Sequence, residues 1–148
     1  MNDQHDISVL NGLITTTLDS LKGFEDAADD AKSTRFATLF TSFVHDRGQI
    51  VATLQAEVRN LGGEPEDSSS LLGAAHRSFM DLKQALTGKN DKAIIDEVER
   101  GEDHIKAKFE KASKDAELQP AARDVIRDAF VSVKAGHDQM RDLKHSLA

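Results

Sequence analysis

Hydrophobic residues recur at intervals of three and four along most of this chain, a spacing that places them on one face of an α-helix. The pattern predicts four long helices, at residues 6–31, 34–61, 91–116 and 120–147. A fifth, shorter helix is predicted at residues 70–86. No segment carries a convincing strand pattern, so the sequence predicts an all-α protein.

The breaks between these helices carry residues that start or stop helices. Ser33 or Thr34 can cap the second helix, Gly62-Gly63 follows its end, and Pro120 falls in the first turn of the last helix. The first two and the last two long helices are joined by tight linkers, which favour antiparallel hairpins. The short helix, about 25 Å long at 1.5 Å per residue, can return the chain along the bundle. We therefore expect a single domain over residues 1–148, a ferritin-like four-helix bundle with a short helix in the crossover between two hairpins.

Composition narrows the function classes. The 148 residues include no Cys, Trp or Tyr and carry a net charge of −7. Without Cys there are no disulfides, thiolate metal sites or thiol nucleophiles. The acidic balance argues against nucleic acid and anionic membranes as partners. The polar, acidic N-terminus differs from a signal peptide, and no apolar run approaches the roughly 20 residues of a membrane span. A cytoplasmic protein is expected.

Three polar residues fall on the apolar stripes of the long helices. Glu25 lies four residues after Leu21, Glu102 lies four after Val98, and His137 lies three before Met140. Their spacing predicts that all three side chains point into the bundle. A buried carboxylate is costly unless it is paired or bound to metal, and carboxylates with imidazole suit iron or manganese. We therefore take these three residues as candidate metal ligands.

The candidate ligand set is incomplete. A dinuclear carboxylate centre in a bundle takes a Glu from each of two helices and a Glu-x-x-His pair from each of the others. Lys134 stands where the Glu of the His137 pair is required, and the second helix offers no ligand at the matching level. In the absence of a metal, Lys134, Arg47 or water would neutralise the buried carboxylates. A redox centre is therefore the weaker interpretation, and no cofactor is expected.

Two other features bear on function. His76 stands beside the stripe of the short helix, but Phe79 and Met80 occupy the positions where histidine phosphotransfer modules usually carry Lys-Gly. That spacing argues against phosphotransfer. Several apolar residues lie outside the main stripes and make a homodimer or higher homo-oligomer plausible: Leu13, Val44, Val51 and Val131.

Three segments together resemble one bacterial family, the domain of unknown function numbered twenty-three eighty-three. They are His76–Gly88, similar to its His-Arg-x-aromatic-Met signature, Glu99–Asp103, similar to its Glu-Arg-Gly-Glu-Asp box, and Leu21–Ala28. The resemblance implies a ferritin-like bundle of unassigned activity, often grouped with stress-associated proteins. That family commonly has Trp or Tyr where Phe24, Phe79 and Phe109 stand, which argues against tyrosine-dependent redox chemistry here.

Two functions follow as expectations. The first is a non-catalytic, stress-associated bundle that acts through binding or oligomerisation, with its buried carboxylates neutralised by the protein itself. The second is a degenerate metal-binding bundle in which Glu25, Glu102 and His137 hold iron or manganese. We favour the first, because a working redox centre needs a fuller ligand set.

Overall fold

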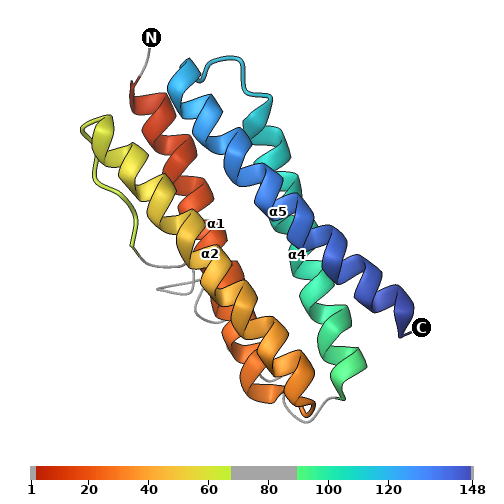
Figure 1. Ribbon diagram of the computed structural model, residues 1–148. Coiled ribbons are helices and arrows are strands. Elements are labelled where there is room, and N and C mark those ends of the chain that lie inside the picture. Colours follow the sequence, from red (N-terminus) through yellow and green to blue (C-terminus); the bar gives the residue numbers. More distant parts are fainter. Residues whose placement is uncertain (1–2, 68–89, 148) are drawn as a thin grey trace.

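The computed structural model describes residues 3–67 and 90–147, and within them all regular secondary structure is α-helical, as predicted (Figure 1). The helices are α1 (Asp3–Asp30), α2 (Thr34–Asn60), α4 (Asp91–Ser113) and α5 (Pro120–Ser146). The short helix predicted at residues 70–86, together with His76, lies outside the described residues. None of the described helices is long and apolar enough to cross a membrane.

The helices form two antiparallel hairpins, α1–α2 and α4–α5, that pack side by side (Figure 1). The carboxylate of Asp91, at the start of α4, accepts hydrogen bonds from the backbone N–H groups of Lys32 and Ser33 in the α1–α2 turn, at 2.8 and 2.9 Å. The end of α2 and the start of α4 therefore lie at opposite ends of the bundle, as the predicted order of hairpin, crossover and hairpin requires.

The helix ends follow from local sequence. The Asn90 side chain caps α4 by accepting from the N–H of Ala93 at 2.9 Å, and Pro120 opens α5. Gly62 takes a left-handed φ of 81° just after α2. Helix α4 ends at Ser113, three residues before the predicted boundary. The cause is a turn in which Asp115 accepts from the N–H of Glu117 at 2.9 Å, which competes with continued helix.

The buried core has two apolar halves, one toward each end of the bundle. One half contains residues from all four helices: Leu10, Ile14, Leu54, Val58, Ile105, Phe109, Ile126 and Val133. The other half is richer in aromatic residues: Phe24, Phe36, Phe40, Phe43, Ile94, Ile95 and Met140. These are largely the stripes that the spacing of three and four predicts.

The structure corrects the basis of the predicted self-association. Leu13 and Val51 are buried, at 4% and 6% exposed, and belong to the first apolar half. Val44 packs against the second half. Val131 on α5, 69% exposed, is the one strongly exposed large hydrophobic residue in the described ranges. Three of the four residues that suggested an oligomer are therefore accounted for by the protein's own core.

Candidate functional site

A polar layer separates the two apolar halves, and each helix contributes to it. Its members are Ser20 from α1, Arg47 from α2, Glu102 from α4 and His137 from α5. Arg47, Glu102 and His137 are 1%, 2% and 5% exposed. Charged groups are rarely buried this deeply unless they are paired, so the contacts within the layer decide what it can do.

Arg47 and Glu102 form a buried ion pair at the centre of the layer. Nη2 of Arg47 donates to Oε2 of Glu102 at 2.6 Å, and Nη1 donates to Oγ of Ser20 at 3.1 Å. Burial raises the pKa of Glu102 above its usual range, while the neighbouring Arg47 guanidinium opposes that rise. The positive charge that a metal would otherwise supply to this carboxylate comes from the protein.

The guanidinium of Arg47 rests against two aromatic rings. Phe24 and Phe43 stack with their centroids 4.5 Å apart, and the guanidinium carbon lies 5.6 and 5.8 Å from the two centroids. Such contacts stabilise a cation that has lost its water. Across the bundle, Gly136 leaves room for it, because a methyl group there would lie 2.7 Å from Nη2 of Arg47 and 2.8 Å from Cε1 of Phe43.

The predicted site residues divide between interior and surface. Glu102 and His137 point into the bundle, as expected. The inward orientation predicted for Glu25 is wrong: its side chain is 43% exposed and pairs with Lys22 at 3.5 Å. The predicted role of Lys134 is also wrong, because its ammonium lies on the surface and pairs with Asp138 at 2.9 Å.

These positions bear on the ferritin-type metal centre. Within the described residues, Glu25, Glu102 and His137 do not bring their donor atoms together as one group. Glu102 is committed to Arg47, and Glu25 lies on the outside of α1. The donor set therefore does not fit a dinuclear carboxylate centre, because too few carboxylates reach the interior. Metal binding by these three residues stays a prediction.

Sequence reasoning placed Arg47 among several groups that could neutralise a carboxylate, without giving it the central role. A signal for that role was present. Arg47 lies four residues after Phe43 and three before Ile50, so it occupies the apolar stripe of α2 by the same spacing that selected Glu102. A cation and an anion on facing stripes are each other's simplest partners.

His137 faces carboxylates with both ring nitrogens. Its Nε2 lies 2.6 Å from Oδ1 of Asp103, and its Nδ1 lies 3.1 Å from Oδ1 of Asp138. Hydrogen bonds from Lys134 and then from His137 lower the pKa of Asp138 to about 2. Glu99, one turn before Asp103 on α4, pairs with Lys144 at 3.3 Å.

A cavity of about 190 Å³ opens between α1 and α4 beside the polar layer. Its walls are mostly apolar, with Phe24, Val98 and Ile105 among them, and Gly23 and Gly101 form part of the lining on opposite helices. Four ionisable side chains also line it: Asp19, Glu97, Glu102 and His104. Glu102 is neutralised by Arg47, and Glu97 pairs with the exposed Arg100 at 3.0 Å. The lining itself contains acids but no Lys or Arg, so the cavity favours a positively charged occupant.

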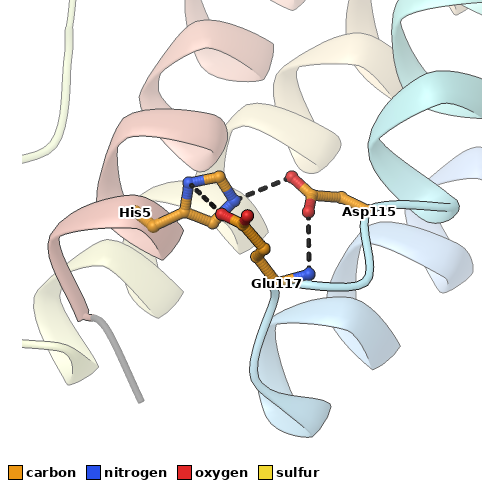
Figure 2. Close-up of side chains that lie close together, drawn as sticks. All are labelled: His5, Asp115 and Glu117. Carbon is orange, nitrogen blue, oxygen red and sulfur yellow. Dashed lines mark hydrogen bonds and ion pairs between the residues drawn. The ribbon is translucent and has the colours of Figure 1, made fainter.

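A second polar cluster lies at one end of the bundle, where Figure 2 shows His5 of α1 facing the α4–α5 loop. Nε2 of His5 lies 2.8 Å from Oδ2 of Asp115, and Nδ1 lies 3.8 Å from Oε2 of Glu117. The other oxygen of Asp115 accepts from the Glu117 N–H. Nearby, Gln119 donates to the buried carboxylate of Asp6 at 2.7 Å. These contacts fasten the start of α1 to the loop, which is a structural role.

We expect the His5–Asp115 contact to make stability depend on pH. The hydrogen bond to Asp115 raises the pKa of His5 above 6.5, and the Glu117 N–H and then His5 lower that of Asp115 below 3.8. The His5 contribution is therefore complete below pH 6.5 and is lost as pH rises through the raised pKa. The Asp115 contribution is complete above pH 3.8 and is lost as pH falls through the lowered pKa.

NMR titration of the His5 ring tests this expectation. The pKa should lie above 6.5 in the unchanged protein and should fall in Asp115→Asn. The amide introduced by that substitution keeps the shape of the acid but not its charge, so the comparison isolates the electrostatic contribution. A His5 pKa that does not respond to Asp115→Asn would contradict the assignment.

Comparison with known proteins places this geometry in a family and a fold. The model of the domain of unknown function DUF2383 matches residues 5–115. No curated protein sequence matches the chain. Among solved structures, the chain is similar to a two-domain protein of Anabaena variabilis ATCC 29413 that contains DJ-1/ThiJ/PfpI-like and ferritin-like domains. The TM-score is 0.81 at 16% identity, and the match covers 100% of this chain and 41% of that one.

At that identity the structural likeness concerns the fold, and the chain spans less than half the length of that two-domain protein. It confirms the ferritin-like bundle that hydrophobic spacing predicts. The family match covers α1, α2 and α4, including the Glu99–Asp103 box that carries part of the polar layer. The chain therefore belongs to the DUF2383 family, a ferritin-like domain of unknown function.

Proposed function

We propose that this protein is a non-catalytic binding domain that holds a small organic cation with an apolar body in the cavity between α1 and α4. The observation that carries the proposal is a pair of glycines, Gly23 and Gly101. Both line the cavity from within helices, and a methyl group at either position would meet no atom within 4 Å. Neither has a positive φ.

A glycine inside a helix costs roughly 0.5–1 kcal/mol relative to alanine. At Gly23 and Gly101 neither backbone conformation nor packing accounts for that cost. What the two glycines do provide is space, since any larger side chain would extend into the cavity. We take this as support for a cavity whose volume serves the function.

The size and lining of the cavity indicate the class of ligand. A closed apolar cavity of about 150 Å³ can hold benzene, so about 190 Å³ suits a ring or short chain with one polar group. The apolar walls favour such a body, and the acids Asp19 and Glu97, in a lining without Lys or Arg, favour a positive charge on it. A ring that carries an aminomethyl group, which is protonated at neutral pH, is a simple molecule with both properties.

The polar groups at the inner end of the cavity support binding over catalysis. The Glu102 carboxylate is paired with Arg47, and Oγ of Ser20 accepts from the same guanidinium. A general base or a nucleophile needs its lone pairs free to approach a substrate. A fold that hosts many functions does not itself select a reaction. The stress association implied by the family resemblance is part of this proposal.

We expect benzylamine to bind in this cavity and benzoate not to bind, because the two share a ring and differ in charge. Titration of the ¹⁵N-labelled protein should show saturable shifts of amide signals confined to the facing parts of α1 and α4. Benzyl alcohol, which is neutral, should bind more weakly than benzylamine. Gly101→Leu fills the cavity and should abolish the benzylamine shifts.

Gly12→Leu is the matched control for this substitution. Gly12 is also in α1, a methyl group there would also meet no atom within 4 Å, and it lies outside the lining of this cavity. The Gly12→Leu protein should bind benzylamine like the unchanged protein. The proposal fails if benzylamine gives no saturable shifts, or if Gly101→Leu binds it as well as Gly12→Leu does.

A further inference from the structure

The imidazole ring of His137 has a carboxylate next to each of its two nitrogens. Its two ring nitrogens face Asp103 and Asp138 at 2.6 and 3.1 Å. A neutral imidazole has one N–H, so one of the two carboxylates then faces a nitrogen lone pair. Two acceptors at such a distance repel each other unless a positive charge lies between them. That charge is either a second ring proton or a metal ion.

The Asp138 carboxylate can accept the one N–H of a neutral His137 ring. Lys134 holds the Asp138 carboxylate at 2.9 Å, and Arg141 lies 3.4 Å from it, so this acid is a fixed, ionised acceptor. In the tautomer that donates from Nδ1 to Asp138, the ring presents the Nε2 lone pair to Asp103. A carboxylate behind a histidine in this way orients the ring and makes the opposite nitrogen a better metal ligand.

A second carboxylate completes the group. Glu99 lies four residues before Asp103 on the same face of α4, and donor atoms of Glu99, Asp103 and His137 all lie within 4.8 Å of one another. We infer that these three residues form a binding site for one divalent first-row transition metal ion. The site is separate from the cavity of the proposed function, and its failure would leave that proposal standing.

The ligand types narrow the choice of ion. An imidazole nitrogen with two carboxylate oxygens suits manganese, iron or zinc, whereas calcium and magnesium prefer oxygen ligands alone. Three protein ligands leave room for water on the metal. The Asp103 side chain is 60% exposed, so an ion can enter from solvent and the carboxylate can shift to coordinate it.

Lys144 works against this site. Its ammonium lies 3.3 Å from Oε2 of Glu99, a ligand that the metal must share or take over. Lys134 and Arg141 are held by Asp138 on the far side of the ring, and Arg47 is held by Glu102. The substitution Lys144→Met should therefore tighten metal binding, which a site elsewhere on the protein would not show.

Calorimetric titration of the full chain with Mn²⁺ and with Zn²⁺ tests the inference. The titrations are made in a His5→Ala background, so that the second His–carboxylate group cannot bind. We expect one ion per chain, with affinity at least about tenfold lower in Asp103→Asn and in His137→Ala. Asp138→Asn should lower it about 10- to 100-fold, the usual effect of removing a partner of a ligating histidine. Asp142→Asn, which removes a 72% exposed carboxylate from α5, should leave it unchanged.

Circular dichroism of each variant checks its fold. If His137→Ala does not fold, the Asp103→Asn variant still tests the site, because the Asp103 side chain is largely exposed and its substitution should not disturb the fold. Broadening of the His137 ring signals by Mn²⁺ would support the site directly. The inference is overturned if neither ion binds saturably, or if Asp103→Asn binds as tightly as Asp142→Asn.

Discussion

Replacing Arg47 by methionine should destabilise the protein by about 3–5 kcal/mol at pH 7, the usual cost of breaking a buried ion pair from one side. Methionine keeps most of the side-chain volume but leaves the Glu102 carboxylate buried without its cation. Chemical denaturation followed by circular dichroism measures the free energy of unfolding. A loss below about 1 kcal/mol would show that Glu102 finds another partner or reaches water.

Two comparisons separate charge from packing in this prediction. The double variant Arg47→Met/Glu102→Leu should regain most of the lost stability, because replacing a whole buried pair by apolar groups is often neutral or stabilising. The single variant should also be less impaired near about pH 4–5 than at pH 7. Burial already raises the pKa of Glu102, and the loss of Arg47 removes the largest opposing influence.

The sign of this pH effect follows from the raised pKa. A carboxyl group with a folded pKa above its unfolded value stabilises the folded state when it is protonated. In Arg47→Met the stability deficit is therefore complete above the folded pKa of Glu102 and shrinks as pH falls through it. A deficit that grows toward low pH would contradict this account.

Substituting alanine for Gly136 should destabilise the protein by about 1–3 kcal/mol, the typical cost of overpacking a core. The added methyl group would lie 2.7 Å from Nη2 of Arg47 and 2.8 Å from Cε1 of Phe43. The ring cannot retreat easily, because it is stacked on Phe24. The guanidinium cannot move without lengthening its contact with Glu102, so the ion pair and the aromatic stack are both disturbed.

Gly101→Ala is the matched control, since it adds the same methyl group to a helix where no atom lies within 4 Å. It should stabilise the protein by about 0.5–1 kcal/mol through helix propensity. Thermal or chemical unfolding should then show a loss of stability for Gly136→Ala and a gain for Gly101→Ala. Equal effects at Gly136 and Gly101 would show that the guanidinium and the Phe43 ring adjust freely.

The fold was predictable because it depends on features that are repeated along the chain. Each long helix carries its apolar stripe through several turns, so an error at one position does not change the assignment. The residues at which the helices end were less predictable, since each helix end depends on single contacts. The early end of α4 at Ser113 depends on the turn made by Asp115, which helix propensity does not reveal.

The candidate site was less predictable because it depends on the phase of single residues. Glu25 lies near the edge of its stripe, and a small rotation of α1 exposes it, whereas Glu102 and Arg47 lie at the centres of theirs. The pairing of His137 with Asp103 and Asp138 depends on how α4 and α5 rotate against each other. Spacing within one helix does not contain that information.

The ring stack beneath Arg47 has a practical consequence, because the chain contains no Trp or Tyr. Phe24→Trp would introduce the protein's one indole, against an emission background that is almost dark. Phe24 also lines the cavity, which gives the larger ring somewhere to extend. A single fluorophore would then touch both the buried guanidinium and the proposed ligand, and its emission would respond to a change at either of them.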